Sequence, residues 1–369
     1  MRKVPFFDYP KLYTSNKKDF LRIFDEVSSR GAYILQKDVV DFEKSIADFC
    51  NVKHAIGVAN ATDALEIAFH LSGIKKGDEV IMPSHTMTAS PSAVVANGGV
   101  PILIDCNEDG LINPDLIEKN ITNKTKYIMP VQLNGRTCKM EKILALSKKY
   151  NLKIIEDSAQ GLGSKYKNKQ AGTFGLAGVF SFYPAKILGT LGDGGMIITN
   201  DDKLAEKIYQ FRDHGRNNLN CDIWGRNSRL HNLHAAFLLF QFKDFNKTIN
   251  RRREIAQIYF DELKNCNDIK LPIFSEDSDH FDTFQNFEVL ANNRDSLKEY
   301  LSKNNIGSII QWGGKAIHQF ENLGLTDFVL PKTDAYFKKC LLLPINLFLS
   351  DADIKYVSET IKNFYKSNV

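Results

Sequence analysis

Apolar residues in the first fifty positions recur every three or four residues. The segments 17–28 and 39–49 both show this spacing, so each predicts a helix with one buried face. From residue 55 onward, short apolar runs typical of buried strands alternate with helical stretches. The predicted strands are 55–58, 79–82, 101–104, 127–131, 153–156, 179–182 and 196–199, and the predicted helices are 64–71, 89–96, 114–120, 140–150 and 204–211. This alternation predicts an α/β fold in which a mostly parallel central sheet is flanked by helices.

The pattern changes towards the end of the chain. A long helical stretch ends at residue 242, and a further helix over 251–263 carries the chain into a second region. That region combines the predicted strands 286–290 and 306–311 with the predicted helices 294–302 and 351–364. A chain of 369 residues is long enough for two cores. We therefore predict a large domain over 1–250, which begins with an N-terminal arm, and a small C-terminal α+β domain over 251–369.

Composition and charge exclude several classes of protein. The chain is 43% hydrophobic and 25% charged, which is ordinary for a soluble globular protein. A net charge of +4 without a long basic run argues against nucleic acid as a partner. The first residues contain no apolar run of signal-peptide length, and no apolar window is long enough to cross a membrane. The six cysteines include no C-x-x-C pair, so we expect reduced thiols in the cytoplasm rather than a disulfide framework or a zinc site.

One lysine lies in a stretch with an unusual composition. Lys186 belongs to the segment SFYPAKILGTLGDGG (181–195), between an aromatic, apolar run and a turn rich in glycine. Glycine permits the close backbone approach that a flat ligand needs. A lysine that is shielded from water at such a place has a lowered pKa and can attack a carbonyl carbon. The alternative is an ordinary surface lysine on a loop, which is where most lysines lie.

A carboxylate follows the apolar strand 153–156, at Asp157. A reactive lysine and an acid at neighbouring strand ends are what a pyridoxal-phosphate (PLP) enzyme requires, the lysine for a Schiff base and the acid beside the pyridinium nitrogen. Gln132 and Gln160 also follow predicted strands. Because ligands of such sheets bind outside the carboxyl ends of the strands, these three side chains can face one crevice.

A phosphate seat is predicted where the helix 64–71 begins. The residues just before it, 59–63, are small or polar, and backbone N–H groups at a helix start attract anions. The alternative is that Asn60 or Thr62 simply caps the helix.

Together these motifs resemble the DegT/DnrJ/EryC1/StrS family of PLP-dependent aminotransferases. The resemblance covers nearly the whole chain. The matching stretches, in order, are 32–35, 42–43, 61–65, 77–80, 155–160, 181–195, 227–230 and 343–344. The resemblance implies the fold of aspartate aminotransferase (fold type I). Most members of the family aminate keto sugars that are linked to nucleotides.

The resemblance also implies roles for single residues. Lys186 would form the internal aldimine and then move a proton between substrate and cofactor. Asp157 would pair with the pyridinium nitrogen, and Gln160 would contact the phenolic oxygen of the cofactor. The phosphate would be held by Ala61, Thr62 and Ser181, and by Asn227 of a neighbouring subunit. The last role implies a homodimer with its active sites at the subunit interface.

Three positions depart from the family pattern. Ala61 stands where the family usually has Gly, a change that a backbone contact tolerates. An aromatic residue that stacks on the PLP ring is usual at the position of Met87, so Met87 and the nearby His85 are our candidates for covering the ring. Asn134 stands where many sugar aminotransferases have Tyr, so the acceptor pocket is expected to differ there.

Further candidates concern the substrate and metals. Arginine makes bidentate contacts to phosphates and carboxylates. Our candidates for contacting the donor or acceptor are Arg212, His214, Arg216 and Arg229, together with Trp312 and His318 of the small domain, for which simple packing is the alternative. His231 and His234 are one helical turn apart, a spacing that can bind a metal. No third ligand is evident, so no metal is expected.

These expectations combine into an aminotransferase that works by two half-reactions. Glutamate, the usual donor in the family, would convert PLP to pyridoxamine phosphate, which would then aminate the keto group of a nucleotide-linked deoxy sugar in cell-surface polysaccharide or glycoconjugate biosynthesis. An alternative acceptor is a small phosphorylated ketose such as dihydroxyacetone phosphate. Two other functions are sugar dehydration, for which similar proteins carry histidine in place of the lysine, and non-enzymatic regulation. The presence of Lys186 argues against dehydration. The intact set of Lys186, Asp157, Thr62 and Ser181 argues against a non-enzymatic regulator.

Overall fold

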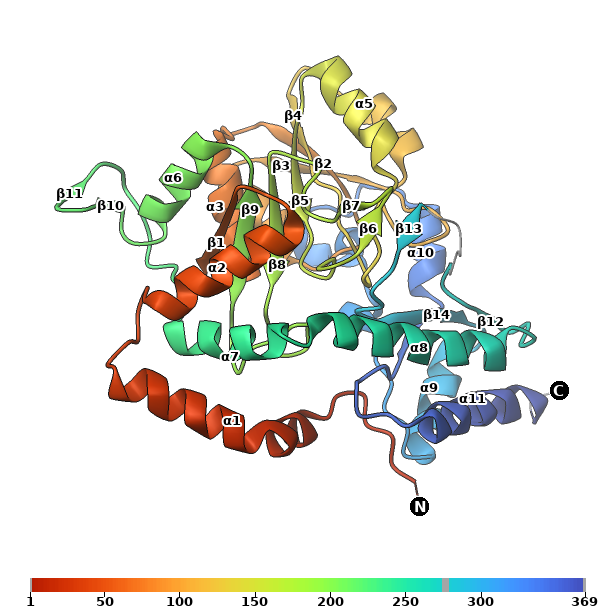
Figure 1. Cartoon of the computed structure of the whole chain (residues 1–369). Helices are drawn as coiled ribbons and strands as arrows, with labels where there is room; N and C mark the ends of the chain where they lie inside the picture. Colours follow the sequence, from red (N-terminus) through yellow and green to blue (C-terminus); the bar gives the residue numbers. More distant parts are fainter. Residues whose placement is uncertain (1, 274–278, 368–369) are drawn as a thin grey trace.

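A seven-stranded sheet forms the centre of the larger part of the molecule (Figure 1). The computed structural model describes residues 2–273 and 279–367. The strand order is β1-β9-β8-β5-β4-β2-β3, and β9 runs antiparallel to both of its neighbours while the other pairs are parallel. The strands are β1 (His54–Val58), β2 (Glu79–Pro83), β3 (Val100–Ile104), β4 (Thr125–Ile128), β5 (Lys153–Asp157), β8 (Ala177–Ser181) and β9 (Gly195–Thr199). The predicted α/β fold with a mostly parallel central sheet is confirmed.

Helices cover both faces of this sheet. Alternate side chains of a strand point to opposite faces. On β9, Ile197 packs with α3, α4 and α6, whereas Met196 and Ile198 pack on the other face with α2 and α7. The central strands are therefore buried on both sides, which explains their continuous apolar runs. The helices are α2 (Lys37–Cys50), α3 (Ala61–Ser72), α4 (Ala89–Ala96), α5 (Met140–Tyr150), α6 (Asp202–Phe211) and α7 (Asn232–Phe242).

A second, smaller core lies around the sheet β12-β14-β15 (Figure 1). Its elements are α8 (Phe245–Leu263), β12 (Ile269–Lys270), β14 (Phe287–Ala291), α9 (Arg294–Lys303), β15 (Cys340–Leu343) and α11 (Asp351–Lys366). The N-terminal segment joins this core, because Val4 is buried in it and bridges Ile306. The predicted domain boundary at 250/251 lies inside α8, whose start (Phe245) packs in a core cluster of the large sheet and whose end (Leu263) packs in the small core. The exact domain limits remain a prediction.

Three predicted elements differ from the structure. Residues 114–120 form two 3₁₀ turns, η1 (Pro114–Leu116) and η2 (Glu118–Asn120), in place of an α-helix. The strand predicted over 127–131 ends at Ile128, since Pro130 has no N–H for the ladder. Residues 306–311 make isolated bridges at Ile306 and Ile309 instead of a strand. In this segment, the backbone of Phe6 lies so close to Gly307 that a Cβ on residue 307 would be 2.6 Å from the Phe6 nitrogen.

One long helix, α1, and several short elements complete the chain. They are α1 (Tyr9–Ser29), β6 (Lys165–Tyr166), β7 (Lys169–Gln170), β10 (Arg216–Asn217), β11 (Asn220–Cys221), β13 (His280–Phe281), η3 (Gln311–Gly314), η4 (Ile317–Gln319), η5 (Glu321–Leu323) and α10 (Pro331–Phe337). The sequence pattern did not predict β15 or α10. Within the described ranges, we find no helix that is both long and apolar enough to cross a membrane.

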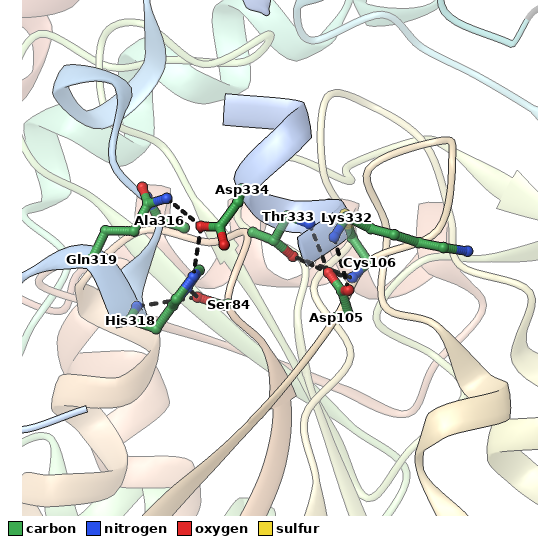
Figure 2. Close-up of polar contacts among 9 residues, drawn as sticks. All are labelled: Ser84, Asp105, Cys106, Ala316, His318, Gln319, Lys332, Thr333 and Asp334. Atoms are coloured by element: carbon green, nitrogen blue, oxygen red, sulfur yellow. Dashed lines mark hydrogen bonds and ion pairs between the residues drawn. The ribbon is translucent and has the colours of Figure 1, made fainter. Parts of the chain in front are cut away.

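The segment that carries η4 and α10 returns to the large sheet, as Figure 2 shows. Ser84 directly follows β2, and its hydroxyl is 2.7 Å from His318 Nδ1. The Asp334 carboxylate accepts from His318 Nε2 at 2.9 Å, so in the neutral imidazole the Ser84 hydroxyl donates to Nδ1. Asp105, just past β3, accepts from both the backbone N–H and the hydroxyl of Thr333 at 2.6 Å. These buried contacts tie the C-terminal part of the chain to the carboxyl ends of β2 and β3.

Candidate active site

A pocket of about 410 Å³ lies at the carboxyl ends of the central strands. Asp157 ends β5 and Ser181 ends β8, and both line it. The volume lies in the usual range of small-molecule sites, roughly 300–1,000 Å³. Of the residues predicted from the sequence, Ala61, Thr62, Met87, Asp157, Gln160, Ser181, Lys186 and Trp312 line this pocket. Residues far apart in the sequence thus meet where the fold class places ligands.

Lys186 lies in the turn that follows β8. Its backbone N–H donates to the Tyr183 carbonyl at 2.8 Å, which closes the turn. Burial of the ammonium group lowers the pKa of Lys186 to about 8, and the carboxylate of Asp157 partly opposes this by raising it. A lysine with such a pKa has far more neutral amine near pH 7 than a surface lysine has. It is therefore suited to act as a nucleophile and as a base.

The Asp157 carboxylate is held by two donors. The Ser90 hydroxyl donates to Oδ2 at 2.6 Å, and the backbone N–H of Ala159 donates to Oδ1 at 3.1 Å. Ser90 uses its only proton on Asp157, so the Thr86 hydroxyl, 2.6 Å from Ser90 Oγ, is the donor in that contact. The two bonds hold the Asp157 carboxylate in one orientation at the wall of the pocket.

The start of α3 provides the predicted phosphate seat. Asn60 caps the helix, with its side chain accepting from the Asp63 N–H at 2.8 Å. The first bond of the helix runs from the Ala64 N–H to the Asn60 carbonyl, so the N–H groups of Ala61 and Thr62 precede it and can serve a ligand. Asn60 can therefore cap the helix while the N–H groups of Ala61 and Thr62 bind a phosphate.

A glycine allows the sheet to approach this helix start. Gly195 pairs with both Val58 and Ser181, so the ends of β1 and β8 and the start of β9 meet beside α3. A Cβ on Gly195 would lie 2.3 Å from the Asn60 carbonyl carbon. This close approach brings Ser181 to the same pocket as α3.

Gln160 is fixed through its amide oxygen. Its Oε1 accepts from the Asn134 backbone N–H at 2.9 Å and from Asn286 Nδ2 at 3.2 Å. Since both bonds use the oxygen, the NH₂ group of Gln160 is left to donate towards the pocket. The Asn134 side chain turns away to Glu288, to which it donates at 2.7 Å. Asn134 is thus placed beside the pocket, and it holds Gln160 with its backbone.

The two candidates for covering a ring lie in different environments. Met87 is half-exposed and lines the pocket. His85 is fully buried, is absent from the described pocket lining, and packs against Trp312, Tyr336 and Phe337. Its Nδ1 donates to the Gly110 carbonyl at 2.8 Å. Met87 therefore has the better position to contact a ligand, whereas His85 supports Trp312 from behind.

The candidates between residues 212 and 229 lie outside this pocket in a single chain. Arg229 pairs with Asp213 at 2.7 Å, and the buried Arg212 guanidinium pairs with Glu43. The candidates His214, Arg216 and Asn227 surround the base of the hairpin β10–β11, which projects from the molecule in Figure 1. At this hairpin, Leu219 and Trp224 are almost completely exposed, at 102% and 97%. No described atom of the same chain covers these side chains.

The two candidates of the C-terminal part also differ. Trp312 lines the pocket and adopts a left-handed backbone conformation, with φ of 49°. His318 does not reach the described lining, because both of its ring nitrogens are engaged by Ser84 and Asp334 (Figure 2). The structure thus gives His318 a structural role, which was the alternative considered for it.

His231, the N-cap residue of α7, lies close to His234 of the same helix. The His231 and His234 rings are tilted by 36° with centroids 5.2 Å apart, and His234 Nδ1 is 3.0 Å from the Asp193 carbonyl. Among the described residues, no group of three or more His, Cys, Asp or Glu side chains is arranged to hold a metal ion.

Sequence reasoning missed several residues around the pocket. Phe7 of the N-terminal segment, Gln285 and Asn286 line it, and Ser90 supports Asp157. Their positions depend on tertiary contacts across 67 to more than 100 positions of the chain, and no local pattern reports such contacts. For Gln285 no such signal was available, because the segment before 287–291 also contains the polar residues Asp282, Thr283 and Asn286.

The residues present fit PLP. Lys186 supplies an amine of lowered pKa, Asp157 an oriented carboxylate, α3 a set of free N–H groups beside the Ser181 hydroxyl, and Gln160 an amide donor. These groups match, in turn, an aldehyde, a pyridinium nitrogen, a phosphate and a phenolic oxygen. One pocket therefore contains complementary groups for each polar part of the cofactor.

Comparisons with known proteins agree with this arrangement. The sequence profile of the DegT/DnrJ/EryC1/StrS aminotransferase family matches residues 14–362. The chain is 38% identical over 363 residues to the dTDP-3-amino-3,6-dideoxy-alpha-D-galactopyranose transaminase of Aneurinibacillus thermoaerophilus. The aligned region covers 98% of this chain and 99% of the relative. It is 35% identical over 367 residues to a protein of Geobacillus stearothermophilus named pleiotropic regulatory protein, with 98% and 99% covered.

A solved structure extends the likeness to three dimensions. The chain superimposes on S. venezuelae DesV in complex with a ketimine intermediate with a TM-score of 0.94, at 32% identity and with 99% of each chain covered. Fold type I, which the resemblance implied, is thereby confirmed. This protein belongs to the DegT/DnrJ/EryC1/StrS aminotransferase family and is a PLP-dependent transaminase.

Proposed function

We propose that this transaminase moves an amino group from glutamate to the keto group of a nucleotide-linked deoxy sugar, in the biosynthesis of a cell-surface polysaccharide or glycoconjugate. One observation carries the proposal. Lys186, whose pKa is lowered, and Asp157 line the same pocket beside the start of α3. The class of acceptor is supported by the Aneurinibacillus relative, which is named for a dTDP-linked amino sugar.

The roles of the residues follow from their positions. PLP, when bound, supplies an electron sink for the pair of electrons released at the substrate carbon. Asp157, oriented by Ser90, holds a proton at the ring nitrogen. Lys186, whose pKa is lowered to about 8, takes and returns the proton at that carbon. The N–H groups of Ala61 and Thr62 and the Ser181 hydroxyl bind the phosphate. Met87 and Trp312 border the space that is left for the acceptor.

The other functions receive less support. A small phosphorylated ketose is a less favoured acceptor, because the transaminase relative reported above is named for a dTDP-linked amino sugar. The Geobacillus relative is named a regulatory protein, so regulation deserves a direct test. Sugar dehydration is disfavoured since Lys186 is present.

We also propose a homodimer in which Asn227 of one subunit completes the phosphate site of the other. Within one chain Asn227 is exposed and lies away from the described pocket lining, beside the projecting hairpin with its exposed Leu219 and Trp224. A second copy that buries these apolar side chains would bring Asn227 near a pocket. We place the enzyme in the cytoplasm, in keeping with six unpaired cysteines.

The test uses the absorbance of the purified protein loaded with PLP. Glutamate is expected to shift the cofactor band, and one member of a panel of ketones is expected to restore it. The panel contains dTDP-, GDP- and UDP-linked keto sugars and dihydroxyacetone phosphate, so the restoring ketone identifies the acceptor class. Lys186→Ala should abolish the cycle. Restoration by dihydroxyacetone phosphate alone would overturn the proposed acceptor, and a protein that takes up no PLP would favour regulation.

A further inference from the structure

One glutamine holds the backbone on both sides of Lys186. The Nε2 group of Gln285 donates to the Ala185 carbonyl at 2.9 Å. Its Oε1 accepts from the Ile187 N–H at 2.5 Å. A single planar amide therefore pairs with the residue before the lysine and with the residue after it, as a neighbouring strand would. This arrangement fixes the direction in which the Lys186 side chain leaves the turn.

Gln285 is itself held firmly. Arg252 on α8 donates through Nη1 to the carbonyls of both Phe284 and Gln285, each at 3.0 Å. On the other side, the Thr283 N–H donates to the Gly135 carbonyl at 2.8 Å. Gln285 is 5% exposed and Arg252 is 8% exposed, so water does not compete for these bonds. The glutamine is thus a rigid support rather than a chance surface contact.

The position of Gln285 also links Lys186 to the smaller part of the molecule. Gln285 precedes β14, which lies in the middle of the small sheet, whereas Lys186 follows β8 of the large sheet. Both residues line the same pocket. Gln285 therefore connects the small sheet directly to the backbone next to the lysine.

We propose that Gln285 is a positioning residue for Lys186, which aims the lysine amine at the aldehyde carbon of PLP. The inference rests on the proposed role of Lys186. If Gln285 acts through the lysine, replacing it should weaken the binding of a ligand that forms a covalent bond to the amine. It should leave the binding of a ligand that forms no such bond unchanged. PLP carries an aldehyde, which condenses with an amine to a C=N bond with loss of one water molecule. Pyridoxamine phosphate carries an amine in its place, fits the same pocket and forms no such bond.

The test compares equilibrium binding of these two molecules to the protein freed of cofactor. Gln285→Met keeps the length of the side chain and removes both hydrogen bonds. Loss of two buried hydrogen bonds is expected to weaken PLP binding about tenfold, while pyridoxamine phosphate binding changes less than about twofold. The matched control is Gln241→Met, since Gln241 donates to the Gly189 carbonyl of the same turn at 2.8 Å but does not flank the lysine. This control should leave both affinities unchanged.

A double-mutant cycle separates the possible failures. In a Lys186→Ala protein, PLP should bind no better than pyridoxamine phosphate, and adding Gln285→Met should change neither affinity. If Lys186→Ala binds PLP as tightly as the wild type, the role of Lys186 itself is wrong. If Gln285→Met weakens both molecules equally, or neither, Gln285 does not act through the lysine. Should Gln285→Met fail to fold, Gln285→Glu, which keeps the acceptor for Ile187 and loses the donor, is judged by the same criteria.

Discussion

Lys186 and Asp157 influence each other through charge and burial. Burial lowers the pKa of Lys186 to about 8, and the Asp157 carboxylate opposes that shift. In the protein freed of cofactor, the rate of acetylation of Lys186 should therefore rise with pH around a midpoint near 8. Asp157→Asn removes the opposing charge, so the midpoint should move to lower pH. Peptide mass spectrometry over a pH series measures it, and an upward shift in Asp157→Asn would contradict the assignment.

Ser90 offers a second test at the scale of one residue. Its hydroxyl is one of two donors to Asp157, so Ser90→Ala leaves Oδ2 without this bond. We expect transaminase kcat/KM to fall about tenfold, as for loss of a hydrogen bond to a charged group. Ser90→Thr keeps the hydroxyl and should restore most of the activity. Equal losses in both variants would mean that packing around α4, and not the bond to Asp157, is what matters.

The sequence could predict Lys186, Asp157 and Thr62 because each lies in a local motif. The sequence could not tell whether His85 or Met87 covers the cofactor ring. Only the tertiary structure shows that His85 is buried in the core and that Met87 lines the pocket. Gln285 was out of reach for another reason. Its partners are 98 and 100 positions away, and a side-chain amide that binds backbone leaves no trace in composition or periodicity.

At the scale of elements, the contact between β9 and α3 determines the phosphate seat. A Cβ on Gly195 would come within 2.3 Å of the Asn60 backbone, which cannot move without displacing the helix start. Gly195→Ala should lower the free energy of unfolding by roughly 3 kcal/mol and weaken the binding of inorganic phosphate. Urea unfolding and phosphate titration measure the two effects.

Gly192→Ala is the matched control for this prediction. The nearest atom to a Cβ at Gly192 is His234 Cε1, at 2.8 Å, at the end of a ring that can rotate away. Its effect on stability should therefore be clearly smaller. Equal destabilisation by the two substitutions would show that the approach of β9 to α3 is not the sensitive contact.

Elements with long apolar patterns were predicted well, and short ones were not. The central strands have buried faces on both sides, so their apolar runs are continuous and easy to recognise. The predicted helix over 114–120 became two 3₁₀ turns because a segment this short obtains its shape from its neighbours. The predicted strand over 306–311 failed because its two bridges go to different partners, Val4 and Leu342, which are distant in sequence.

At the scale of the whole molecule, the chain crosses between its two cores more often than two consecutive domains would. Val4 is buried in the small core, and Ile317 and Leu330 are buried in the core of the large sheet. The contacts of Thr333 with Asp105 and of His318 with Ser84 hold this C-terminal segment against the large sheet (Figure 2). Sequence patterns predict which elements exist, but such crossings depend on which buried surfaces fit each other. The pocket is bordered by residues from both regions as a result.

The proposed dimer makes a prediction that no single chain can satisfy. Each complete site would combine Lys186 of one subunit with Asn227 of the other. Lys186→Ala removes the amine, and Asn227→Asp sets a carboxylate against the phosphate, so each homodimer should be nearly inactive. A mixed dimer contains one site with both substitutions and one site with neither.

Co-expression of the two variants in equal amounts should therefore restore about a quarter of the wild-type activity, because about half of the dimers are mixed and half of their sites are intact. Purification through two different affinity tags isolates the mixed dimer, whose activity should reach about half of the wild-type value. If Asn227 served the pocket of its own chain, every site in the mixed dimer would carry one substitution and no activity would return. Recovery thus depends on the projecting hairpin delivering Asn227 across the interface.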